Sequence, residues 1–134
     1  EIQTLATGDD RIIFTGFVAG QALEELYSNA YLYLLPSDLE GMPLSLLEAM
    51  SYGNCCVVSD IAECSEVVED KAVTFQKSNV QDLKEKLQRL CDDPATVQKY
   101  KNEAADFICS KYNWDEITQK TLEVYEDRYE NLND

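Results

Sequence analysis

The sequence predicts an α/β fold: a parallel β-sheet with helices on both faces, followed by a helical C-terminal tail. Short apolar segments alternate with amphipathic ones over residues 11–78, which is the pattern of repeated strand–helix units. The apolar segments are continuous rather than alternating, as in strands that are buried on both faces. From residue 79 onward only helical periodicity remains.

The first elements follow a polar lead-in over residues 1–10. RIIFTG (11–16) is a brief apolar run that ends at a glycine, and we expect it to form a buried strand. A helix is expected next, over residues 20–30, where Leu23 and Tyr27 recur at helical spacing.

The central elements surround a turn. A second strand is expected over residues 31–37, where Pro36 stops it. After the turn, residues 44–53 read as a helix that is closed by Gly53, the usual residue just past a helix end. A third strand is expected over residues 55–60.

The last elements are a short helix over 62–70, a fourth strand over 72–76 and three amphipathic helices. We interpret the chain as one domain, with an α/β core over residues 1–78 and a helical extension over 79–134. The three helical segments are VQDLKEKLQRLCDD, PATVQKYKNEAADFICSKY and WDEITQKTLEVYEDRYENL.

The composition excludes several functions. The 134 residues carry a formal net charge of -15, which argues against autonomous binding to nucleic acid or to anionic lipid. There is no histidine, so Ser-His-Asp and Cys-His nucleophile systems and His-containing zinc sites are excluded. No apolar run approaches the roughly 20 residues of a membrane span, and the N-terminus does not resemble a signal peptide.

The five cysteines are an odd number without regular spacing, which is a poor disulfide framework. Cys55 and Cys56 lie in an apolar run, where cysteine usually acts as a small buried hydrophobe; a redox or metal role is the less favoured alternative. We therefore expect free thiols, a cytoplasmic location and no metal site.

The segment PSDLEGMPLSLLEAMSYG (36–53) follows the carboxyl end of a strand, where ligands of parallel α/β sheets bind. Gly41 would let the backbone approach a ligand closely, and Pro43 suits a first helical turn. Free amides at a helix N-terminus form an anion site, although a plain strand-to-helix turn fits equally well. The amides expected to be free are those of Met42, Leu44 and Ser45.

Two carboxylates frame this turn. Glu48 is the only charge between residues 41 and 59, in a helix that is apolar nearly all round, so we expect it to be buried. A buried carboxylate needs donors, either sugar or ribose hydroxyls or a backbone amide. A glycosidase dyad of Glu40 and Glu48 is disfavoured, because two residues eight apart along a helix are separated by roughly 12 Å, whereas such pairs need about 5.5 to 9.5 Å. Glu40 precedes the helix, so the sequence leaves the distance between the two carboxylates open.

With its flanking residues, this pair resembles the E-x7-E signature of the group 1 (family 4) glycosyltransferases. The resemblance covers residues 11 to about 129, in the order of the family. Its blocks are RIIFTGFV, the Pro36-Ser37 to Gly53 segment around the two glutamates, CCVVSDIAECSEVVED, and the Trp114 to Tyr125 helix.

The resemblance implies a retaining GT-B enzyme, built from two Rossmann-like halves, that needs no metal or other cofactor. This chain would be the C-terminal half, which binds the nucleotide-sugar donor, and its partner would be the N-terminal half, through which the enzyme could lie peripheral to the membrane. Glu40 would contact the transferred sugar or the adjacent phosphate as the catalytic residue, and Glu48 the ribose hydroxyls. Gly16 and Phe17 would lie against the base. The backbone amides over residues 41–45 would hold the diphosphate. These are the amides of Gly41, Met42, Leu44 and Ser45, since Pro43 has no N–H.

The sequence departs from the pattern of the family in two places. The family's basic Arg/Lys pair, which neutralises the leaving diphosphate, has no counterpart in the chain, since Arg11 does not match it. Ala62 and Glu63 replace frequent family glycines. Two rivals remain: a catalytically silent α/β binding module, or a receiver-like signalling module with Asp60 at a strand end.

Overall fold

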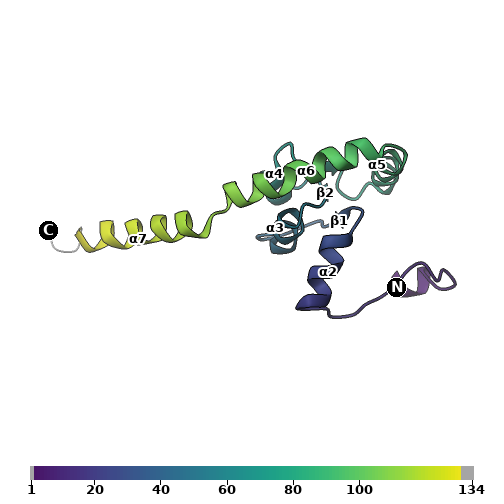
Figure 1. The fold of residues 1–134 in the computed structure, drawn as a ribbon, viewed down its shortest axis with the longest axis horizontal. Coiled ribbons are helices and arrows are strands. Elements are labelled where there is room, and N and C mark those ends of the chain that lie inside the picture. Colours follow the sequence, from purple (N-terminus) through teal and green to yellow (C-terminus); the bar gives the residue numbers. More distant parts are fainter. Residues whose placement is uncertain (1, 131–134) are drawn as a thin grey trace.

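The computed structural model describes residues 2–130, apart from the side chains of Trp114 and of residues 126–130. Three strands alternate with helices and three longer helices follow (Figure 1). In chain order the elements are α1 (Ile2–Leu5), α2 (Gln21–Asn29), β1 (Tyr33–Leu35), α3 (Leu44–Ser51), β2 (Cys56–Ser59), α4 (Ala62–Val68), β3 (Val73–Phe75), α5 (Val80–Asp92), α6 (Pro94–Lys111) and α7 (Trp114–Glu130).

The sheet has the order β1-β2-β3 and is parallel throughout. Tyr33 pairs with Cys56 in one ladder, and Val57 pairs with Val73 in the other. β2 lies in the middle and all of its residues are buried, as its continuous apolar sequence predicts. The predicted parallel sheet is confirmed.

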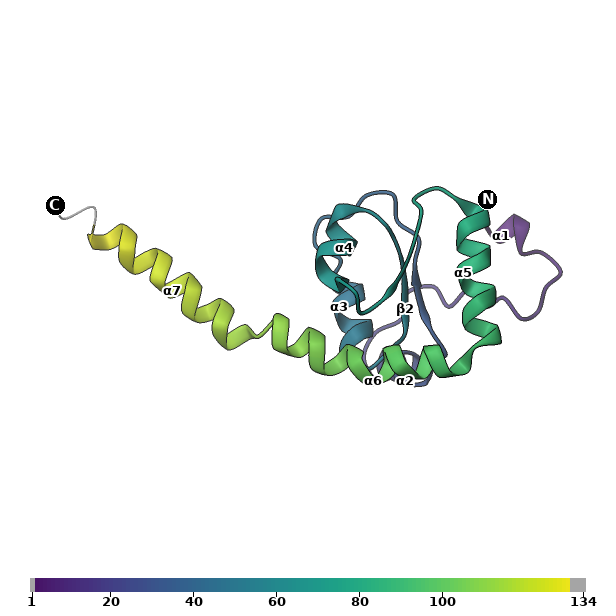
Figure 2. The ribbon, with the colours of Figure 1, turned by 90° about the horizontal axis from the view of Figure 1, so that it is seen from above.

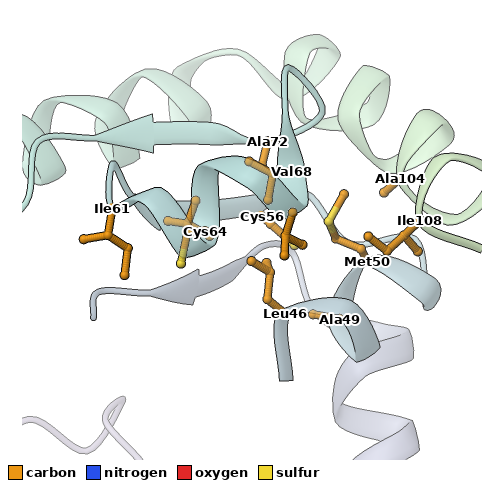
Figure 3. Packing of buried hydrophobic residues seen from close by; sticks show 12 residues of the cluster. Leu46, Ala49, Met50, Cys56, Ile61, Cys64, Val68, Ala72, Ala104 and Ile108 are labelled. Atoms are coloured by element: carbon orange, nitrogen blue, oxygen red, sulfur yellow. The ribbon is translucent and has the colours of Figure 1, made fainter. Parts of the chain in front are cut away.

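Helices cover both faces of the sheet. Neighbouring residues of β2 point to opposite faces, so they belong to two different core clusters. Cys56 and Val58 belong to a cluster with α3, α4 and the second half of α6 (Figure 3). Cys55 and Val57 belong to a second cluster, with α5 and the start of α6. Figure 2 shows α5 on one side of the sheet and α3 with α4 on the other.

The predicted strand over residues 11–16 is wrong. This segment is irregular, and its apolar side chains are exposed: Ile12 by 49%, Ile13 by 79% and Phe14 by 49%. A strand needs a neighbour for its backbone hydrogen bonds, and no described strand pairs with this segment. The sheet therefore has three strands instead of the expected four, and the expected lead-in contains the short helix α1.

The three C-terminal helices differ in their packing. α5 and α6 lie against the sheet, and each begins at a polar cap: Asn79 accepts from the Asp82 amide at 3.0 Å, and Asp93 from the Thr96 amide at 3.2 Å. α7 projects away from the sheet as an arm (Figures 1 and 2). Within residues 2–130, no helix combines the length and apolar character that a membrane crossing requires.

All five cysteines are free thiols, three of them buried. Cys55 and Cys56 are fully buried in the middle of the sheet, on opposite faces. Burial raises the pKa of Cys55 to about 11, and burial also raises the pKa of Cys56. These thiols therefore act as small apolar groups in the core.

This burial predicts alkaline destabilisation. In the unfolded chain Cys55 ionises near its ordinary pKa of 9.0, whereas in the folded chain it stays protonated up to a pKa of about 11. Between pH 9 and 11 the unfolded state then binds fewer protons than the folded state. The free energy of unfolding should therefore fall over this range, by about 3 kcal/mol for this one thiol. Urea unfolding at a series of pH values measures the fall.

The control compares two cysteine variants. Cys55→Ala should make the free energy of unfolding less dependent on pH between 9 and 11, whereas the exposed thiol variant Cys91→Ala should keep the wild-type dependence. Equal pH dependence in the wild type and in Cys55→Ala would contradict the role of the buried thiol.

Candidate functional site

The candidate site is the loop over residues 36–43, which leads from the carboxyl end of β1 to the start of α3. Ligands of open α/β sheets bind outside the carboxyl ends of the strands. β1 lies next to the central strand, and α3 packs on β2 and on α6. The loop is therefore held between two well-packed elements.

Glu40 is half-buried at the end of this loop, and the Ser37 hydroxyl donates to its Oε1 at 2.5 Å. Burial is the main cause that raises the pKa of Tyr33 and of Cys64, and the charge of the Glu40 carboxylate contributes to both shifts. The carboxylate thus lies within electrostatic reach of a partly buried phenol and a buried thiol, and one of its oxygens accepts a short hydrogen bond.

The start of α3 offers backbone donors, although fewer than expected. Pro43 is buried and precedes the helix, and its carbonyl accepts from the Leu46 amide at 2.9 Å. The Leu44 amide was expected to be free, but it donates to the Met42 carbonyl at 2.8 Å. This tight turn leaves the amides of Gly41, Met42 and Ser45 without a protein acceptor in the described part of the chain.

The backbone at Gly41 faces open space, since a Cβ atom there would meet no atom within 4 Å. No side chain caps α3 at its N-terminus. The uncapped helix end and the open space together leave room for an anion at the free amides.

Glu48 was expected to be buried and is exposed. The buried side of α3 consists of Leu46, Ala49 and Met50, which pack into the core, whereas Leu44 is 63% exposed. The helix is apolar nearly all round in sequence, but only one side of it packs. Glu48 lies outside that side and is open to solvent.

Glu48 nevertheless has a protein partner that the sequence did not indicate. The Tyr27 hydroxyl of α2 lies 3.4 Å from Glu48 Oε2 and 3.4 Å from the Ser45 carbonyl oxygen. Tyr27 was assigned only to the apolar face of its helix. Nothing in its spacing pointed to the site, because α2 and α3 meet only in the folded chain.

Gly16 and Phe17 lie in the irregular segment before α2. The Phe17 side chain is 95% exposed, and Gly16 adopts a left-handed backbone with φ 66°. Among the described residues, no hydrogen bond joins this segment to the loop over 36–43. Glu40, Glu48 and the amides thus lie on the loop and the adjoining helix α3, and Gly16 and Phe17 lie on the separate segment before α2.

A largely apolar cavity of about 490 Å³ lies beside α3. It brings together Met42, Leu44 and Glu48 with side chains of α6, of the residue after α6 and of α7, which the sequence did not connect with the site. Those additional residues are Ile108, Cys109, Tyr112 and Ile117.

The charged residues of the loop itself are both acidic, Asp38 and Glu40. Arg11 is exposed and paired with Asp9 through contacts of 2.8 and 2.6 Å, away from the loop. Over the residues that the structure describes, no group of three or more Cys, Asp or Glu side chains could hold a metal ion. The donors that the loop itself offers are therefore its backbone amides.

Comparison with known proteins places the chain in a family. Residues 3–107 match the family described as glycosyl transferases group 1. An uncharacterized glycosyltransferase of Methanocaldococcus jannaschii is 30% identical over 117 residues, which are 86% of this chain and 30% of that protein. An N,N'-diacetylbacillosaminyl-diphospho-undecaprenol alpha-1,3-N-acetylgalactosaminyltransferase of Campylobacter jejuni is 34% identical over 105 residues. These residues are 76% of this chain and 27% of that protein.

A solved structure shares the fold. Sucrose-phosphate synthase from Thermosynechococcus elongatus aligns with a TM-score of 0.83 at 22% identity, over 96% of this chain and 33% of that one. The match confirms the predicted fold class. The chain spans about a third of the length of these relatives. It belongs to the group 1 family of glycosyl transferases.

Proposed function

We propose that this chain is the donor-binding half of a retaining glycosyltransferase, which transfers a sugar from a nucleotide-diphosphate sugar to an acceptor hydroxyl. One observation carries the proposal: Glu40 and three free backbone amides lie between the carboxyl end of β1 and the first turn of α3, and the exposed Glu48 follows in that helix. A chain preceding this one would supply the other half of the cleft, with the acceptor site and basic groups for the leaving diphosphate.

Each part of the loop has a distinct role in this proposal. The amides of Gly41, Met42 and Ser45 hold the diphosphate at the positive end of α3, so that no metal is needed. Glu40 faces the transferred sugar or its adjacent phosphate. Glu48 is exposed, so its carboxylate is open to ribose hydroxyls.

The location follows from the same proposal. Free thiols in the core suit a reducing compartment, so we propose a cytoplasmic enzyme that lies at the membrane only through the preceding half. The relatives' names specify no common donor.

The contact between Glu48 and ribose can be tested directly. Glu48→Gln should weaken the binding of UDP, GDP or ADP, whichever binds the wild-type chain, by about 1–3 kcal/mol, because a charged acceptor of ribose hydroxyls is lost. Calorimetry should show the same loss of affinity when the wild type binds the 2′,3′-dideoxy form of that nucleotide. The Glu48→Gln variant should bind the dideoxy form no more weakly than it binds the ribose form.

The matched control is Glu85→Gln, an exposed glutamate of α5 on the other face of the sheet. It should leave nucleotide affinity unchanged. A Glu48→Gln loss that is the same for the ribose and dideoxy forms would contradict the ribose contact. Absence of binding by all three nucleotides would contradict the donor site itself.

A further inference from the structure

Three tyrosines form an aromatic cluster beside α3, and the proposed function has not used them. Tyr27 comes from α2, Tyr33 from β1, and Tyr52 from the residue after α3. The Tyr27 ring stacks on Tyr52 with ring centroids 5.5 Å apart, and it is tilted against Tyr33 at 6.0 Å. Aromatic contacts from two elements thus fix the position of the Tyr27 ring.

The hydroxyl groups of this cluster reach the site residues. Tyr33 donates to Ser45 Oγ at 2.9 Å, in the first turn of α3. The Tyr27 hydroxyl lies 3.4 Å from both the Ser45 carbonyl and Glu48 Oε2. This hydroxyl has one proton, so it donates to one of these two acceptors at a time. Both distances are longer than a typical O–H···O bond, so a small shift of the hydroxyl would shorten the bond to either acceptor.

The backbone of Tyr27 is also attached to α3. Asn54 is 1% exposed, and its side-chain amide donates to the Tyr27 carbonyl at 2.9 Å and to the Ala49 carbonyl at 3.0 Å. A buried amide with two well-formed bonds is costly to displace. Tyr27 is therefore held to α3 through its backbone, while its ring and hydroxyl lie toward the first turns of the helix.

The protonation state of Tyr27 suits a donor. Burial, together with the neighbouring Tyr33 and Glu48, raises its pKa to about 12. The phenol therefore keeps its proton at neutral pH. Glu48 Oε1 has no protein donor among the described residues, which leaves that oxygen for a ligand.

We propose that Tyr27 is a positioning residue for nucleotide binding: its hydroxyl orients the Glu48 carboxylate, so that the free oxygen Oε1 faces the ribose. This inference rests on the proposed function, because it assigns a partner to the residue proposed to bind ribose. The role is indirect, since Tyr27 acts through Glu48 and does not itself touch the nucleotide.

A double-mutant cycle on the full chain tests this role. The Kd of UDP, GDP and ADP is measured by calorimetry for the wild type, Tyr27→Phe, Glu48→Gln and the double variant. Tyr27→Phe keeps the ring contacts and should weaken binding about three- to tenfold. In the Glu48→Gln background the same change should have less than about a twofold effect, because the group that Tyr27 orients is gone.

The matched control is Tyr31→Phe, whose hydroxyl donates to the Leu90 carbonyl of α5 at 2.9 Å, away from α3. It should leave nucleotide affinity unchanged. A Tyr27→Phe loss of equal size in both backgrounds would overturn the inference and indicate a general structural effect. An unchanged Kd in Tyr27→Phe would also overturn the inference. If no nucleotide binds the wild type, the proposed function itself fails, which is a distinct result.

Discussion

Glu40→Gln should lower the turnover of the full-length enzyme that contains this chain by about 10²- to 10³-fold. In our proposal this carboxylate faces the reacting sugar or its phosphate, where charge changes during transfer. Glutamine keeps the size and the hydrogen bond from Ser37 but removes the charge. Turnover with a panel of UDP-, GDP- and ADP-sugars measures the loss.

The affinity for the nucleoside diphosphate alone should change by less than about threefold in Glu40→Gln, since the diphosphate lies on the amides. The control is Asp38→Asn, two residues away in the same loop, whose carboxylate accepts from Ser78 at 2.8 Å. It should keep near wild-type turnover. Equal activity of Glu40→Gln and the wild type would contradict the catalytic role, and an inactive wild type would favour a catalytically silent member of the family.

Leu46→Ala should lower the free energy of unfolding by about 2–5 kcal/mol. Leu46 is fully buried where α3 meets the core (Figure 3), so truncation leaves a cavity as well as losing apolar burial. A domain of this size has only about 5–15 kcal/mol in total, so the loss is a large share. Urea unfolding at neutral pH measures it.

The control is Leu44→Ala on the same helix, two residues earlier. Leu44 is 63% exposed, so its truncation should change the free energy of unfolding by no more than about 0.5 kcal/mol. Similar losses for both variants would contradict the assignment of the buried side of α3.

The sequence predicted the strands and helices of the core well, for physical reasons. The run from Cys55 to Val58 is short and apolar without alternation, which is typical of a strand buried on both faces, and β2 is such a strand. Gly53 marks the end of α3, where the backbone adopts φ 72° and any side chain would be strained.

The predictions that failed concern contacts between elements. Whether Glu48 is buried depends on which side of α3 meets α6, and local spacing does not fix this for a helix with apolar residues all round. The strand over 11–16 failed because strand formation needs a pairing partner, whatever the local propensity. The Leu44 amide is not free, because it donates to the Met42 carbonyl in a tight turn. The presence of Pro43 in the sequence does not by itself predict this turn.

The most direct test of the donor site is chemical-shift mapping of the 134-residue chain with UDP, GDP and ADP. We expect weak binding to one of them, in the sub-millimolar to millimolar range, roughly -4 to -5 kcal/mol. The shifts should concentrate at the amides of Gly41, Met42 and Ser45 and at Glu48. No perturbation over residues 40–48 with any of the three nucleotides, or shifts confined to the α5 face of the sheet, would contradict the account.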